Sequence, residues 1–79
     1  MRRFGQVIET YPYDKKRWLT IWDLERAEQV AVMDRAEPNL KIGQLVTFER
    51  TDISGHIGTI KDVQKIGRRQ LPAHLKPLI

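Results

Sequence analysis

The chain has 79 residues, with 14 Lys and Arg against 10 Asp and Glu for a formal net charge of +4, and it contains no cysteine. This length accommodates one small domain. The absence of cysteine excludes disulfides and thiolate metal sites and fits a reducing compartment, so we expect a cytoplasmic protein. No apolar run approaches the roughly 20 residues of a membrane-spanning helix, and the N-terminal segment lacks the apolar core of a signal peptide. We therefore expect no membrane partner.

Short alternating runs separated by turn residues predict strands. The first strand is expected over Phe4–Thr10. The following Tyr11-Pro12-Tyr13-Asp14 is expected to form a turn or loop, because proline cannot donate to a ladder. Further strands are expected at 17–23, 28–34, 45–50 and 57–65, with connections at 24–28, 36–39 and 53–56.

The second predicted strand organises the rest of the chain. Its sequence, Arg17-Trp18-Leu19-Thr20-Ile21-Trp22, alternates strictly, and successive side chains of a strand point to opposite faces. Leu19 and Ile21 should therefore face the core, while Trp18, Thr20 and Trp22 should share the outer face. Two tryptophans would then be open to water or to a ligand, unless one or both cover the end of a small core.

Five short strands in one small domain predict an all-β fold, a closed or nearly closed five-stranded barrel of the OB type. An SH3-like barrel is the structural alternative. The residues expected in the core are Val7, Leu19, Ile21, Val30, Val32, Val46, Phe48, Ile60 and Val63.

The barrel is expected over residues 1–66, followed by an irregular, basic, proline-containing tail over 67–79. Pro72 and Pro77 oppose ladder pairing in the tail, so we expect no sixth strand there and a contribution of cations rather than of fold. Its leucines either dock onto a partner or pack back onto the barrel.

The segment L-K-I-G-Q-L-V-T-F-E at 40–49 resembles the L-x-x-G-Q-x-V-x-F-E segment of bacterial cold-shock domains. Matching segments occur in register at 5–7, 16–21, 30–33 and 62–63, so the resemblance covers about residues 4–65. It implies a cold-shock-like OB barrel that stacks single-stranded bases on aromatic side chains. Of the positions that are aromatic in that family, only Trp18 keeps an aromatic residue, with Thr20 and Ala31 at two others.

Aromatic and cationic residues are concentrated around the second strand. Exposed rings beside cations suit stacked bases and phosphates. We therefore expect a non-catalytic module that binds single-stranded RNA or DNA. The expected binding residues are Tyr11, Tyr13, Lys15, Lys16, Arg17, Trp18, Thr20 and Trp22.

A small β-barrel that binds protein, within a nucleoprotein or regulatory assembly, is the alternative, because exposed tryptophan beside arginine is also typical of interface hot spots.

Catalysis is not expected. His56 and His74 lie in different settings, whereas acid–base chemistry needs titratable groups brought together. No His/Asp/Glu spacing suits a metal. We expect no cofactor and see no small-molecule substrate.

Overall fold

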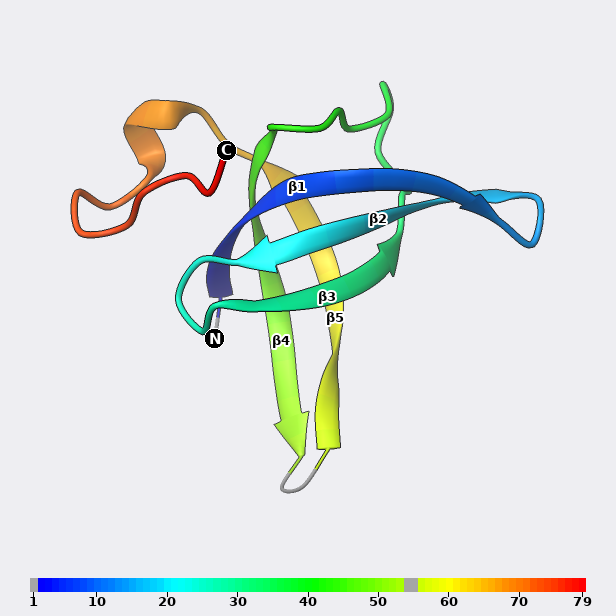
Figure 1. Cartoon of the computed structure of the whole chain (residues 1–79), viewed down its shortest axis with the longest axis horizontal. Helices are drawn as coiled ribbons and strands as arrows, with labels where there is room; N and C mark the ends of the chain where they lie inside the picture. Colours follow the sequence, from blue (N-terminus) through cyan, green and yellow to red (C-terminus); the bar gives the residue numbers. More distant parts are fainter. Residues whose placement is uncertain (1, 54–55) are drawn as a thin grey trace.

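Five antiparallel strands form one sheet in the computed structural model, which describes residues 2–53 and 56–79, and the side chains of 2–51 and 60–79. The strands are β1 (Arg2–Tyr13), β2 (Lys16–Asp23), β3 (Glu28–Met33), β4 (Leu45–Ile53) and β5 (His56–Lys65), followed by a 3-10 turn, η1 (Arg68–Gln70). The predicted all-β class and the five strands are confirmed (Figure 1). The expected connection at 53–56 falls partly on residues 54–55, outside the described residues.

The sheet order is β3-β2-β1-β4-β5, with β1 in the centre. Strand β1 pairs with β2 from Gly5 to Tyr13 and with β4 only from Arg2 to Gln6. The two halves of the sheet cross one another in Figure 1 because both are built on this long, curved strand. No ladder joins β3 to β5 in the described part of the chain, so the sheet is not closed. Of the two forms expected, the closed barrel is not formed.

Strand β1 is longer than predicted, because Tyr11, Pro12 and Tyr13 belong to it rather than to a turn. The turn consists of Asp14 and Lys15 alone, with φ of 52° and 60°, the left-handed backbone that a two-residue hairpin of type I′ requires. Pro12 is tolerated because β4 pairs with β1 only through Gln6. The main chain of Val7 still bonds to Gly43 and Gln44 on that side. Pro12 lies beyond these contacts, at a free edge where a proline costs no ladder bond.

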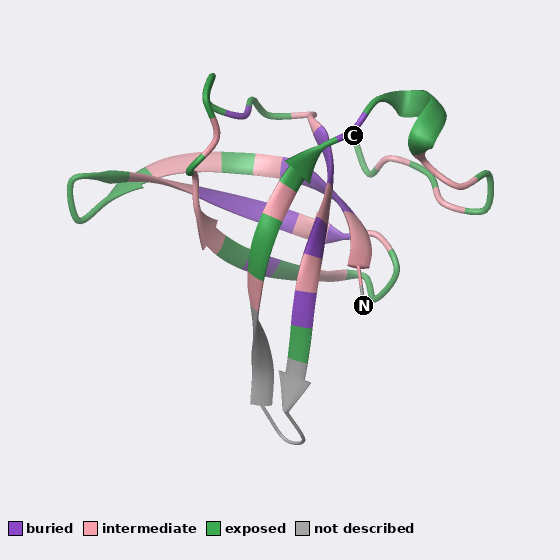
Figure 2. Ribbon diagram, turned by 180° about the vertical axis from the view of Figure 1, so that it is seen from behind, coloured by how far each residue is buried: buried purple, intermediate pink, exposed green. Residues whose placement is uncertain are grey.

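The hydrophobic core lies between the two crossing halves of the sheet, where Figure 2 shows the buried residues of β1, β2 and β4. The predicted core is confirmed: Val7, Leu19, Ile21, Val30, Val46 and Phe48 are buried, and Val32, Ile60 and Val63 pack against them. Leu40, Leu45 and Ile66 are also buried, which the alternation did not predict.

A buried ion-pair network closes the turn between β2 and β3. Asp23 is fully buried and its Oδ1 accepts hydrogen bonds from the main-chain N–H groups of Glu25 and Arg26, at 2.9 and 3.0 Å. Its Oδ2 lies 2.7 Å from Arg50 Nη1, and Arg50 also reaches Glu28 at 2.8 Å. Burying a carboxylate is costly unless an opposite charge and hydrogen-bond donors surround it. Asp23 has both, so we assign it a structural role in this turn.

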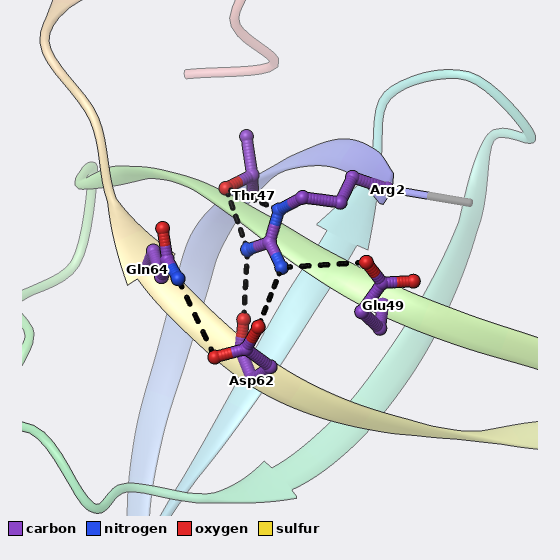
Figure 3. Close-up of polar contacts among 5 residues, drawn as sticks. All are labelled: Arg2, Thr47, Glu49, Asp62 and Gln64. Atoms are coloured by element: carbon purple, nitrogen blue, oxygen red, sulfur yellow. Dashed lines mark hydrogen bonds and ion pairs between the residues drawn. The ribbon is translucent and has the colours of Figure 1, made fainter.

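Arg2, at the start of β1, connects that strand and β4 to β5 (Figure 3). Its guanidinium lies 2.9 Å from Asp62 Oδ2 and donates to the main-chain oxygen of Asp62 at 2.8 Å and to Thr47 Oγ1 at 2.8 Å. Asp62 has a φ of 55° and lies where the register between β4 and β5 shifts. Arg2 therefore fixes a bulge in β5, and its charge is already paired.

The tail contains no strand, as predicted, but it is attached to the sheet through Gln6. The Gln6 side chain is buried; its Oε1 accepts from the main-chain N–H of Leu78 at 2.8 Å and of Ile79 at 3.0 Å. Its Nε2 donates to the main-chain oxygens of Ile79 and Gly43, at 3.1 and 3.0 Å. The end of the tail is therefore fastened to the sheet through its main chain, so the tail contributes to the fold as well as to the charge, while the Leu78 side chain is exposed.

Candidate nucleic-acid interface

Five of the predicted site residues lie together at the free end of the β1–β2 hairpin. Tyr11 is paired with Trp18, and Tyr13 with Lys16. Directly opposite residues of an antiparallel pair share one face, so these four side chains lie on the outer face, with Lys15 exposed in the adjoining turn. We call Tyr11, Tyr13, Lys15, Lys16 and Trp18 the hairpin patch.

The aromatic rings of the hairpin patch contact one another. The ring centroids of Tyr13 and Trp18 are 5.9 Å apart and their planes are nearly perpendicular, at 87°. Tyr13 is 65% exposed, while Trp18 is half-buried between its cross-strand neighbours Tyr11 and Met33. The edge-to-face pair fixes two rings at the surface of a hairpin whose turn projects from the body of the molecule (Figure 1).

The Trp18 indole also carries a polar group without a partner. Its Nε1 is buried and has no hydrogen-bond acceptor among the described residues. An unpaired buried N–H costs about 1–3 kcal/mol. No hydrogen bond from Nε1 to a described residue therefore accounts for the indole at this position.

Arg17 lies on the opposite face from the hairpin patch, contrary to the expectation that it binds phosphate. Alternation along β2 places it on the core side, where its Nε lies 3.2 Å from Asp34 Oδ2 and its Nη2 donates to the main-chain oxygen of Leu40. Asp34 also accepts from the N–H groups of Ala36 and Leu40, both at 3.0 Å. Arg17 therefore holds the loop between β3 and β4.

Thr20 is not an exposed contact residue as expected, since it is only 9% exposed and its Oγ1 donates to Glu9 Oε1 at 3.1 Å. Its strand is covered on both sides, by Glu9 of β1 and Ala31 of β3. A residue in the middle of three paired strands is shielded by its neighbours even on the outer face.

Trp22 shares the outer face with Trp18 but not the hairpin patch. Trp22 lies four positions after Trp18 along β2, or about 13 Å away at roughly 3.3 Å per residue. The Thr20–Glu9 pair lies between them and brings a carboxylate to the surface. Trp22 itself is half-buried and flanked by Gln6 and Gln29.

A second feature is a groove between the outer strands β3 and β5, with a volume of about 1020 Å³. Its apolar lining includes Val30, Val32, Ile60 and Val63, and three cations, Lys16, Arg35 and Lys61, lie along it. The sequence did not predict this groove, because its cations come from three separate elements and form no run along the chain.

No protein-family model matches the chain, and no curated protein or solved structure is significantly similar to it. The resemblance to cold-shock domains therefore stays a prediction. No helix in the described part of the chain is long and apolar enough to cross a membrane.

Proposed function

We propose that the chain binds single-stranded nucleic acid through the hairpin patch. The observation that carries the proposal is the exposed Tyr13 ring held edge-to-face against Trp18, on the same face as Lys16. Bases stack on exposed aromatic rings regardless of their identity, while flanking cations hold the phosphates. The patch offers both groups within a few residues.

Charge and resemblance support the same function. The formal net charge is +4, and neither Lys15 nor Lys16 takes part in an ion pair among the described residues. Because their charges are not neutralised by the protein, they are available to phosphates. The cold-shock-like segments point to single strands of RNA or DNA in the cytoplasm, and the patch suits either nucleic acid.

The test is a titration of fluorescein-labelled oligouridylate and oligothymidylate with the parent and with two tryptophan variants. Trp18→Ala should weaken binding by about 5- to 150-fold, which corresponds to the 1–3 kcal/mol typical of one stacking residue. Trp22→Ala is the matched control: the same residue type on the same strand and face, but outside the patch, so its affinity should equal the parent's. Trp18→Phe should retain most of the affinity, because it keeps an aromatic face.

Tyr13→Ala provides a variant that cannot disturb the core, since that ring is largely exposed. It should weaken binding while leaving the thermal midpoint unchanged. Binding that is equal in the parent, Trp18→Ala and Tyr13→Ala proteins, or a parent that binds neither oligonucleotide, would refute the proposal.

Salt dependence measures the contribution of the two lysines. Each phosphate neutralised on a single strand lowers log K by about 0.7 per unit of log[salt]. Two contacts, from Lys15 and Lys16, predict a slope of about −1.4. The double variant Lys15→Gln/Lys16→Gln should abolish most of this slope, whereas Arg17, already paired with Asp34, should contribute little to it.

A further inference from the structure

The open sides of the sheet leave two strand edges facing the groove. Strand β3 pairs only with β2, and β5 only with β4. On its outer side, β3 has no main-chain partner among the described residues. An uncovered strand edge offers N–H and C=O groups in the spacing that another extended chain matches.

The hydrophobic core is incompletely covered along this groove. Val32, Ile60 and Val63 pack against the buried core and line the groove, but they remain only half-buried. Val30 and Val32 are two residues apart on β3 and so share one face. A chain that added to the β3 edge would place alternate side chains over this apolar surface.

The rim of the groove is positively charged. Lys16, Arg35 and Lys61 are exposed, and none of them forms an ion pair with a described residue. The two acids of the groove are already engaged, Asp34 with Arg17 and Asp62 with Arg2. The unpaired charge around the groove is therefore entirely cationic.

We propose that the β3 edge and this groove bind an extended segment of a partner protein in which apolar residues alternate with Asp or Glu. The segment extends the sheet at β3, its apolar side chains cover the open side of the core, and its carboxylates meet the three cations. This surface differs from the hairpin patch that we propose for nucleic acid, although Lys16 and Trp18 border both surfaces.

A peptide fits this surface better than the two other candidate occupants do. A nucleic acid would use the cations but leave the main-chain edge of β3 unpaired. A second copy of the chain, pairing β3 with β3, would present Gln29, Ala31 and Met33 at the alternate positions. None of these is acidic, and the one acid of β3, Glu28, is already paired with Arg50. The cations would therefore stay unmatched.

The test uses a synthetic peptide of alternating valine with aspartate and glutamate, and a scrambled peptide of the same composition. Binding is followed by amide chemical shifts of the ¹⁵N-labelled full chain. We expect saturable shifts in residues 29–33 with the alternating peptide only. Charge reversal by Lys61→Glu or Arg35→Glu, both at exposed side chains, should weaken binding at least about tenfold, since like charges then face each other.

Lys15→Glu is the matched control, because Lys15 lies in the hairpin turn outside the groove; it should weaken oligonucleotide binding and leave peptide binding unchanged. Lys61→Glu should do the reverse, so the failure of one proposal leaves the other standing. Equal binding of the scrambled peptide, no effect of either groove variant on peptide binding, weaker oligouridylate binding by Lys61→Glu, or a dimer formed through β3 would each overturn the inference.

Discussion

Single buried side chains determine the shape of the loops in this protein. The side chain of Asp34 is fully buried and accepts three hydrogen bonds, from Arg17, Ala36 and Leu40. It therefore joins the end of β3, the following loop and the core face of β2. Asp23 does the same for the turn between β2 and β3. Both residues look like ordinary surface acids in the sequence.

Asp34→Asn should destabilise the fold by about 2–3 kcal/mol, because the amide group presents N–H donors to a guanidinium and to main-chain N–H groups. Urea unfolding followed by tryptophan fluorescence measures the loss. Asp14→Asn is the control, since Asp14 is exposed and asparagine tolerates its positive φ. Equal stability of Asp34→Asn and the parent would show that the carboxylate is not required.

Gly5 is the point of closest approach between strands. A methyl group there would lie 2.7 Å from Ile21 Cγ2, 2.8 Å from Phe48 Cε1 and 2.9 Å from the main-chain oxygen of Trp22. Gly5→Ala should therefore cost about 1–3 kcal/mol through overpacking. Gly67→Ala, whose nearest neighbour would be Gln70 Oε1 at 3.7 Å, should change the midpoint of thermal unfolding little. A midpoint for Gly5→Ala equal to that of Gly67→Ala would contradict this packing.

At the scale of elements, alternation predicted which face of each strand is buried. The period of two placed Leu19 and Ile21 in the core and Trp18 outside, because that pattern depends only on neighbouring residues. It could not show that Pro12 lies in a strand, since the free edge of β1 at that point depends on where β4 begins. Nor could it assign Arg17 to Asp34, a partner 17 positions away in the chain.

The main chain of the tail is hydrogen-bonded to the Gln6 side chain, and this arrangement predicts coupling between the tail and that residue. Gln6→Ala and a chain shortened after Pro77 each remove the same hydrogen bonds between Gln6 and residues 78–79. Their effects on unfolding free energy should therefore be non-additive, with a coupling of about 1 kcal/mol. Chemical unfolding of both single variants and the double variant measures it. Strict additivity would show that the tail gains no stability from Gln6.

At the scale of the whole molecule, an open sheet explains why the site was only partly predictable. The five residues of the hairpin patch lie close together along the chain, so the sequence alone was enough to group them. Lys16, Arg35 and Lys61 meet only because β3 and β5 approach one another without pairing. Five strands in one small domain favour closure, but the number of strands does not determine whether the two edge strands, β3 and β5, pair.

The contacts of Gln6 also bear on the order in which the chain folds. The β1–β2 hairpin brings together residues close in sequence, and hairpins form within about 1–10 μs. The hydrogen bonds from Gln6 to Ile79 span 73 positions, so we expect them to form after the intervening strands have assembled. A stabilising interaction that has not yet formed in the folding transition state lowers the unfolding rate and leaves the folding rate unchanged. We therefore expect the chain shortened after Pro77 to unfold faster than the parent and to fold at the same rate.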